Sequence, residues 1–245
     1  MKFTIILICF AVTVYAVSGN TGSWRIIGGE DAVDKQFPYQ VSLRSFGIHW
    51  CGGSILDEIT ILCAAHCVNG SSPSSLTIRV GNNNLSEQTE EYEVVSFVIH
   101  EDYGVAGINH DLSIIKLSNP IRFHEGVQPI TLRQDDIIEE NVTLSGWGSI
   151  SYPREKSDHL QFIHLNTISL KECQEKLSGS VTDLELCTFT KAGEGACHGD
   201  SGGPLVDANG EQVGIVSWGI PCGMGYPDVF TRVYSFLDWI EANRQ

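Results

Sequence analysis

Short stretches rich in valine, isoleucine, threonine and aromatic residues recur along most of the chain, and clusters of glycine, asparagine, proline and serine separate them. Such stretches between turn-forming residues are typical of the strands of an all-β sandwich or barrel. The clearest predicted strands cover residues 39–44, 54–62, 76–80, 93–100, 112–117, 142–147 and 212–218. The pattern therefore predicts an all-β fold.

Only the C-terminal segment has the periodicity of a helix. Its apolar residues recur at i, i+3, i+4 and i+7: Val233, Phe236, Leu237 and Ile240. Residues with this spacing share one face of a helix, so we expect this face to dock on the body of the protein. Residues 133–141 are polar and acidic, and they predict a linker between two halves of the chain.

The N-terminal segment has the features of a secretory signal. Residues 5–14 form an almost unbroken apolar run after Lys2, and the small residue Ala16 ends a peptidase-type motif. The run is too short to cross a bilayer, and no later segment approaches the roughly 20 apolar residues that a membrane helix needs. We expect residues 1–16 to be a signal peptide and the protein to be secreted, with no membrane partner.

A second processing site follows. Residues 17–25 are mostly polar and end in Arg25, directly before Ile26. A basic residue before isoleucine is a cleavage site for trypsin-like proteases, so we expect residues 17–25 to be an activation propeptide. The remaining residues, 26–245, are enough for one large or two small β domains.

Net charge and cysteine content indicate which partners and which redox compartment suit the protein. The formal net charge of −15 makes nucleic acid a poor partner. Seven of the eight cysteines lie beyond the signal; export favours disulfides, and the odd number leaves one cysteine unpaired. The residues alone leave the pairing open. Sequons are compatible with glycosylation at Asn69, Asn84 and Asn141.

Ser201 is the candidate nucleophile, because it lies in the glycine-rich segment 193–203 just before Pro204. Glycine allows backbone conformations closed to other residues, and it lets a substrate carbonyl approach the main chain. Backbone N–H groups can then converge beside the serine hydroxyl. Acyl transfer requires this combination of a nucleophile and an oxyanion site.

A serine hydroxyl needs a general base, and histidine is the usual one near neutral pH. His66 is the best of the eight histidines, because small residues precede it and Cys67 can anchor its loop. His198 is close enough to Ser201 in sequence to edge a substrate pocket. We expect surface or structural roles for the others: His49, His100, His110, His124, His159 and His164.

The third catalytic group must be a partly buried carboxylate that orients the imidazole. Asp111 fits because it leads directly into the apolar residues 112–115, whereas most other acids lie in polar runs. The alternative is that a buried Asp111 only caps a turn.

Six motifs in register resemble those of the chymotrypsin-like serine proteases, and the likeness runs from Ile26 onward. They are Ile26-Ile27-Gly28-Gly29, Ala64-Ala65-His66-Cys67, Asp111-Leu112, Gly146-Trp147-Gly148, Gly199-Asp200-Ser201-Gly202-Gly203-Pro204 and Ser217-Trp218-Gly219. The resemblance implies two six-stranded antiparallel β-barrels, at approximately residues 26–135 and 136–245, with the active site in the cleft between them and a C-terminal helix.

The resemblance also implies the catalytic roles. Ser201 would attack the scissile carbonyl, His66 would transfer the proton, and Asp111 would orient His66. The N–H groups of Gly199 and Ser201 would bind the oxyanion. Asp200 would pair with the new α-amino group of Ile26 after cleavage, which makes the precursor a zymogen.

The same likeness implies three disulfides, Cys51–Cys67, Cys173–Cys187 and Cys197–Cys222. Cys63 is left over, where relatives usually carry a hydroxyl-bearing residue. A zinc site at Cys63, His66 and Cys67 is disfavoured because no second ligand cluster accompanies these residues. The loop that begins at Asn82 lacks the acid of calcium-binding relatives. We therefore expect no metal and no cofactor.

Specificity is expected to depend on Gly195, Ser217, Gly219 and Asp228. Trypsins carry an aspartate at the position of Gly195, the pocket base, and Gly219 would leave room for large rings. Asp228 replaces a wall glycine of vertebrate relatives, a combination that resembles arthropod chymotrypsins and related collagenolytic proteases. A preference for Phe, Tyr and Leu before the scissile bond is expected.

The alternatives are broad collagenolytic or trypsin-like cleavage, and an inactive homologue that serves as a binding module. All three triad residues are present, which disfavours the inactive homologue. Expected partners are protein or peptide substrates, a trypsin-like activating protease and protein protease inhibitors, for a monomeric enzyme.

Overall fold

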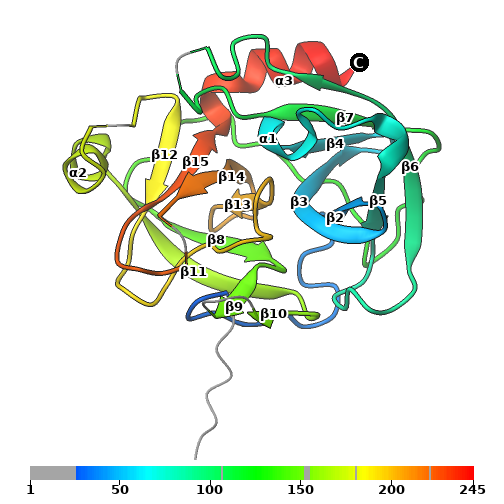
Figure 1. The fold of residues 1–245 in the computed structure, drawn as a ribbon, viewed down its shortest axis with the longest axis horizontal. Helices are drawn as coiled ribbons and strands as arrows, with labels where there is room; N and C mark the ends of the chain where they lie inside the picture. The colour runs from blue at the N-terminus through cyan, green and yellow to red at the C-terminus, as the bar shows by residue number, and fades with distance from the viewer. Residues whose placement is uncertain (1–25, 106, 152–154, 180, 221) are drawn as a thin grey trace, which may run out of the picture.

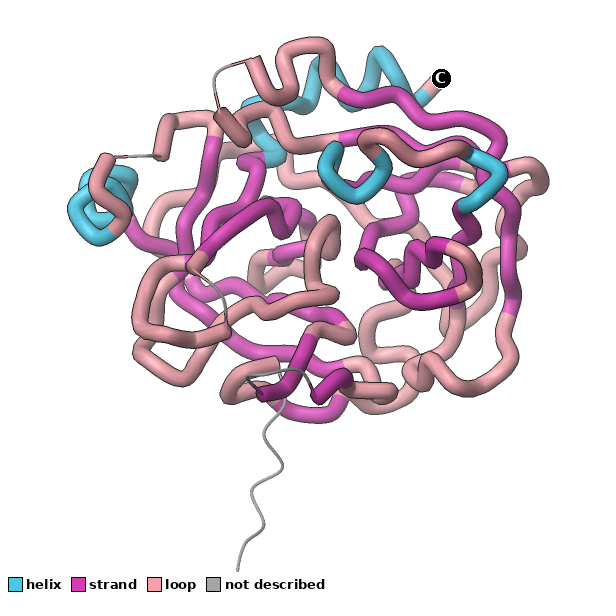
Figure 2. The backbone as a smooth tube through the Cα atoms, in the orientation of Figure 1, coloured by secondary structure: helices cyan, strands magenta, loops and turns pink. Residues whose placement is uncertain are grey.

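The computed structural model describes residues 26–105, 107–151, 155–179, 181–220 and 222–245 (Figure 1). The predicted signal peptide and propeptide lie outside the described residues. Within the described part of the chain, no helix is long and apolar enough to span a membrane. Two β-barrels lie side by side, with short helices at their periphery (Figures 1 and 2).

Six antiparallel strands form the first barrel, which closes in the order β2-β3-β4-β7-β6-β5. Its strand β5 (Leu76–Val80) shows the expected alternation, because every second residue of it is buried. The other strands are β2 (Gln40–Ser45), β3 (Ile48–Asp57), β4 (Thr60–Cys63), β6 (Glu90–Ile99) and β7 (Ser113–Leu117). One predicted strand, 54–62, is in fact two, because a turn separates β3 from β4.

The second barrel closes through the pairings of β8 with both β11 and β13. Its strands are β8 (Asn141–Gly146), β11 (Gln161–Ile168), β12 (Glu185–Thr188), β13 (Pro204–Val206), β14 (Gln212–Gly219) and β15 (Asp228–Arg232). The N-terminal β1 (Glu30–Asp31) adds to β11, so the first described residues belong to this sheet. A small separate hairpin joins β9 (Ser149–Ser151) and β10 (Glu155–Lys156).

The predicted C-terminal helix is confirmed. It comprises a 3₁₀ turn, η2 (Val233–Phe236), and α3 (Leu237–Arg244). Three of its four predicted apolar residues, Val233, Phe236 and Ile240, are buried in the core of the first barrel, although the helix follows the second barrel in sequence. The remaining helical segments are α1 (Ala65–Val68), η1 (Pro73–Ser75) and α2 (Leu170–Lys176).

The connection between the barrels is an ordered segment. Arg133 forms ion pairs with Glu140 at 2.8 Å and with Asp207 at 3.2 Å. Asp207 is buried and directly follows β13, so these contacts fasten the connection to the second barrel. The polar composition that predicted a linker thus reflects a network of ion pairs.

Candidate active site

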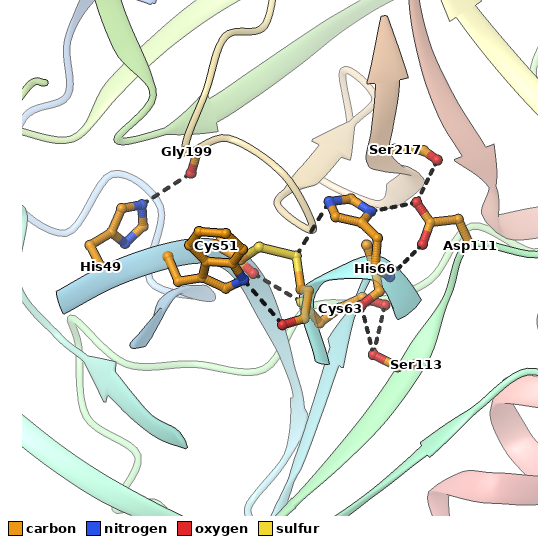
Figure 3. Close-up of a disulfide and its surroundings, with 12 residues drawn as sticks. His49, Cys51, Cys63, His66, Asp111, Ser113, Gly199 and Ser217 are labelled. Atoms are coloured by element: carbon orange, nitrogen blue, oxygen red, sulfur yellow. Dashed lines mark hydrogen bonds and ion pairs between the residues drawn. A yellow bond between two sulfur atoms is a disulfide. The ribbon is translucent and has the colours of Figure 1, made fainter. Parts of the chain in front are cut away.

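The first barrel brings His66 and Asp111 together because the two strands beside them are paired. His66 lies in α1, just after β4, and Asp111 lies just before β7; Cys63 is the register partner of Ser113. Asp111 Oδ2 lies 2.7 Å from His66 Nδ1, and Asp111 Oδ1 accepts a hydrogen bond from the backbone N–H of His66 at 2.9 Å (Figure 3). Both carboxylate oxygens therefore fix the imidazole.

The second barrel holds the same carboxylate from the other side. Ser217 Oγ donates a hydrogen bond to Asp111 Oδ2 at 2.6 Å (Figure 3), and Thr231 Oγ1 donates to the carbonyl oxygen of Asp111 at 2.8 Å. Asp111 is only 1 % exposed. A buried carboxylate is tolerated when hydrogen bonds satisfy it, and here the second barrel supplies some of those that hold Asp111 against His66.

Ser201 lies in the turn between β12 and β13, and its backbone is tied to the first barrel. Its carbonyl oxygen accepts a hydrogen bond from Gly52 N at 2.8 Å. Gly202 packs so closely on Cys63 Sγ that a Cβ atom there would collide with the sulfur. No hydrogen bond among the described residues joins Ser201 Oγ to His66 Nε2, and catalytic hydrogen bonds are often long before substrate binds.

Ser201 opens onto a pocket of about 200 Å³. Three of the four predicted pocket residues, Ser217, Gly219 and Asp228, line it together with His198, Ser201 and Trp218, whereas Gly195 is not one of its lining residues. The volume suits one large amino-acid side chain. This places the candidate nucleophile at the mouth of a side-chain-sized cavity.

Gly199, the second predicted oxyanion residue, has a φ of 105°, a left-handed conformation that favours glycine. Its carbonyl oxygen accepts a hydrogen bond of 3.0 Å from His49 Nε2 (Figure 3), and His49 Nδ1 lies 2.8 Å from Ser42 Oγ. His49 therefore fastens the glycine turn to the first barrel, which fits the structural role expected for it.

Asp200 is completely buried beneath this turn. Its carboxylate accepts hydrogen bonds from Gly148 N at 2.8 Å and Cys197 N at 2.9 Å. A Cβ atom at Gly146 or Gly148 would collide with the carboxylate, so both positions require glycine. Burial raises the pKa of Asp200 to about 6, because the charged form loses hydration that two N–H groups only partly replace.

Ile26 and Ile27 connect the N-terminal segment to the pocket. Ile26 is fully buried in the core of the second barrel, and the carbonyl oxygen of Ile27 accepts a hydrogen bond from Gly195 N at 3.2 Å. The residues that follow Arg25 thus pack directly against the pocket base.

The carboxylate of Asp228 lies against Gly195, the predicted pocket base, as well as against the wall residue Gly219. Its Oδ2 accepts a hydrogen bond from Ala196 N at 2.8 Å and occupies the space that a side chain at Gly195 would need. Its Oδ1 is 3.3 Å from the position of a Cβ atom on Gly219. Burial raises the pKa of Asp228 to about 7, the Ala196 N–H lowers it, and the charge of Asp200 raises it further. The carboxylate therefore contacts both the base and the wall.

All three expected disulfides are formed: Cys51–Cys67, Cys173–Cys187 and Cys197–Cys222. Cys63 is free and buried, and its thiol donates a hydrogen bond to the carbonyl oxygen of Gly52 at 3.2 Å. Burial raises the pKa of this thiol. Because Cys67 is bonded to Cys51, it cannot supply the thiolate that the disfavoured zinc site would require.

Sequence reasoning missed Glu185. This residue is buried, and its Oε1 accepts a hydrogen bond from the indole N–H of Trp218 at 2.7 Å, while Oε2 accepts from Thr182 N at 2.9 Å. Glu185 thus orients an aromatic residue that lines the pocket. The only sequence signal for it is an acid between two leucines, Leu184 and Leu186.

Comparison with known proteins agrees with this geometry. The model of the trypsin family matches residues 26–240. The chain belongs to the trypsin family. Chymotrypsin-2 of Vespa crabro is 44% identical over 221 residues, which cover 89% of this chain and 100% of the hornet protein. Trypsin II-P29 of Gallus gallus is 37% identical over 98% of both chains. The vitellin-degrading protease of Bombyx mori is 35% identical over 97% of this chain and 94% of its own length.

This trypsin-family protein is a chymotrypsin-like serine endopeptidase, and proteins are its substrates. The two closed barrels and the C-terminal helix confirm the fold that the motifs implied.

Proposed function

We propose that this protein is a secreted serine endopeptidase, made as a zymogen, that cleaves after Phe, Tyr and Leu by means of Ser201, His66 and Asp111. The observation that carries the proposal is the His66–Asp111 pair, held at 2.7 Å by both barrels beside the pocket that contains Ser201. A nucleophile, an oriented base and a side-chain pocket are the parts that peptide-bond hydrolysis requires.

In this mechanism Ser201 Oγ attacks the scissile carbonyl carbon and its proton passes to His66 Nε2. Asp111 stabilises the imidazolium that forms. The N–H groups of Gly199 and Ser201 stabilise the oxyanion, and one such donor contributes about 100- to 1,000-fold in rate. His66 then protonates the leaving amine, and water releases the acyl group from Ser201 by the same steps in reverse.

Activation follows from the buried carboxylate of Asp200. Cleavage after Arg25 by a trypsin-like protease creates an α-amino group on Ile26, and an opposite charge beside Asp200 favours the ionised carboxylate. This ion pair orders the oxyanion turn. The packing of Ile27 against Gly195 supports the same idea, since it couples the new N-terminus to the pocket base.

The pocket favours large uncharged side chains, because its volume is about 200 Å³ and Gly219 contributes no side chain to its lining. The Asp228 carboxylate against Gly195 supports a second activity, weaker cleavage after Lys or Arg, as in broad collagenolytic or trypsin-like enzymes. The hornet relative is named a chymotrypsin and the chicken relative a trypsin. We favour the aromatic preference because the negative charge is carried by Asp228, beside Gly195, and not by a side chain at the position of Gly195 itself.

Secretion is proposed from the signal-type N-terminus and the three disulfides, which form in oxidising compartments. Exposed Asn69 and Asn141 are compatible with glycosylation there. We propose that the enzyme is a monomer, needs no metal or cofactor for catalysis, and is subject to protein inhibitors that occupy its pocket.

Replacing the nucleophile tests the proposal. In activated enzyme, Ser201→Ala should lower kcat by about 10⁴-fold or more and abolish labelling by an organofluorophosphate. Ser235→Ala, at an exposed position of η2, is the matched control and should behave as wild type. A Ser201→Ala enzyme with normal turnover would refute the mechanism, and a fully inactive wild type would favour the binding-module alternative.

A further inference from the structure

A second histidine cluster lies next to the candidate triad. His100 directly follows β6, Asp102 is two residues later, and His110 directly precedes Asp111. One potential ligand atom from each of His100, Asp102 and His110 lies within 4.8 Å of the other two. The folding of β6 beside β7 brings the two histidines together, because Ile99 pairs with Ser113.

Aromatic residues of the C-terminal helix enclose one side of this cluster. The ring of His100 stacks on Trp239 with 5.0 Å between centroids, and the ring of His110 is tilted against it with 4.7 Å between centroids. Phe236 meets the edges of both imidazoles, at 5.4 and 5.5 Å. An apolar wall of this kind limits solvent access and fixes ring orientation, as the outer shell of a metal site does.

The imidazole of His100 is held at the cluster by its neighbours. It is buried, and its Nδ1 accepts a hydrogen bond from Asp102 N at 3.2 Å. A cation bound at this nitrogen would take the lone pair that accepts from the Asp102 N–H, so binding would exchange a hydrogen bond for a metal–ligand bond.

Two imidazoles and a carboxylate form the donor set of three-ligand zinc sites, in which water fills the fourth position. Tetrahedral zinc ligands lie about 3.4 Å apart, given bonds of about 2.1 Å. Bringing the ligand atoms from separations of up to 4.8 Å to about 3.4 Å requires movements of about 1 Å. Asp102 is exposed and His110 is partly exposed, so their side chains have room to rotate. Calcium and magnesium prefer oxygen ligands and fit this set poorly.

We propose that His100, Asp102 and His110 bind a zinc-like divalent cation, and that the bound cation lowers proteolytic activity. The sequence predicted only surface or structural roles for these histidines. The inhibitory effect rests on the proposed role of Asp111, the residue after His110. His110 has a φ of 60°, an uncommon conformation for a residue other than glycine. A cation that pulls on His110 therefore acts on the backbone that positions the Asp111 carboxylate.

Calorimetric titration of the activated enzyme with ZnCl₂ tests the site, and kcat/KM at each concentration tests the inhibition. His100→Phe removes the nitrogens but keeps an aromatic ring on Trp239, and His110→Asn keeps a residue that tolerates positive φ. His159→Gln, an exposed histidine elsewhere, is the matched control. We expect one zinc ion to bind wild type and control, with Kd at least about tenfold higher in either cluster variant.

At saturating zinc we expect kcat/KM of the wild type to fall about tenfold. A misplacement of about 1 Å in an active site costs about 100-fold in rate, and the expected shift of the Asp111 carboxylate is a fraction of 1 Å. Unchanged zinc affinity in His110→Asn and in an Asp102→Asn variant would overturn the site, even if His100→Phe failed to fold. Zinc binding that depends on the cluster but leaves kcat/KM unchanged would overturn the inhibition. An enzyme without any proteolytic activity would refute the proposed function, while the calorimetric result would still decide the site.

Discussion

The two barrels differ in how they hold their buried carboxylates. Asp111, at the edge of the first barrel, accepts three hydrogen bonds, one of them from the ring that it orients. In the second barrel, Asp200 accepts two and Asp228 accepts one, all from backbone N–H groups of the described residues. Burial raises the pKa of Asp200 to about 6 and that of Asp228 to about 7.

This difference indicates which of these buried carboxylates already have their partners within the folded protein. The His66–Asp111 pair is assembled from side chains of the folded protein. Asp200 and Asp228 are desolvated and accept hydrogen bonds from so few backbone N–H groups that a nearby positive charge would favour their ionised forms. We infer that Asp200 is completed by the α-amino group of Ile26, and that Asp228 is completed by a cationic substrate side chain.

Among the tests of this comparison, the largest effect is expected when the carboxylate of Asp200 is neutralised. Asp200→Asn keeps the shape but removes the charge that would hold the α-amino group, so kcat/KM should fall by about 100- to 1,000-fold, the cost of a damaged oxyanion site. The measurement requires enzyme whose N-terminal sequencing begins at Ile26. Asp183→Asn, at an exposed position, controls for loss of one acidic charge. Wild-type activity in Asp200→Asn would show that the second barrel needs no such partner.

Removing the carboxylate of Asp228 should change specificity and spare the chemistry. Asp228→Gly should lower kcat/KM for peptides with Arg or Lys before the scissile bond by about tenfold or more, or about 1.4 kcal/mol, and leave Phe and Tyr peptides nearly unchanged. The test is a set of peptides that differ only at this residue. An equal loss for both classes would mean that Asp228 supports the pocket structurally. A wild type that prefers Arg over Phe by tenfold would favour the trypsin-like alternative.

The raised pKa of Asp228 predicts a pH dependence of specificity. Below about pH 7 the carboxyl is protonated and neutral in the free enzyme, and above it the group is charged. The ratio of kcat/KM for Arg to that for Phe should therefore rise several-fold between pH 6 and pH 8, since kcat/KM reports groups of the free enzyme. Effects of pH on the catalytic steps that both substrates share cancel in the ratio. Asp228→Asn should flatten the curve, and a flat ratio in wild type would contradict the prediction.

The fold could be predicted from the sequence where strands are long and regularly patterned. Residues 76–80 were predicted with the boundaries that β5 has. The strands that escaped prediction are short or carry polar residues on one face, such as β13 (Pro204–Val206) and β11 with its exposed His164. Propensity is weak over such lengths, and the neighbouring strands of the barrel decide the outcome.

Some features of the site could be predicted from local sequence, and others depend on contacts made only in the folded chain. Local motifs were sufficient to propose His66, Asp111 and Ser201 as catalytic candidates, and the structure adds the contacts that join His66 to Asp111. The position of the Asp228 carboxylate against Gly195 could not be predicted, since it depends on the register in which Asp228 pairs with Gly219. The aromatic enclosure of His100 likewise depends on a helix that lies more than 130 residues later in the chain.

The smallest expected effect concerns Glu185, a buried carboxylate of the second barrel that accepts a hydrogen bond from the side chain of Trp218. Glu185→Leu leaves the indole N–H without its acceptor, at a cost of about 1 kcal/mol, or about fivefold in kcat/KM. The loss should appear with substrates whose side chain fills the pocket that Trp218 lines, and not with matched substrates that carry glycine before the scissile bond. Glu185→Gln retains an amide oxygen for Trp218 and should recover most of the activity. Equal losses on both kinds of substrate would assign Glu185 to general stability, because Trp218 acts on the substrate through the pocket that it lines.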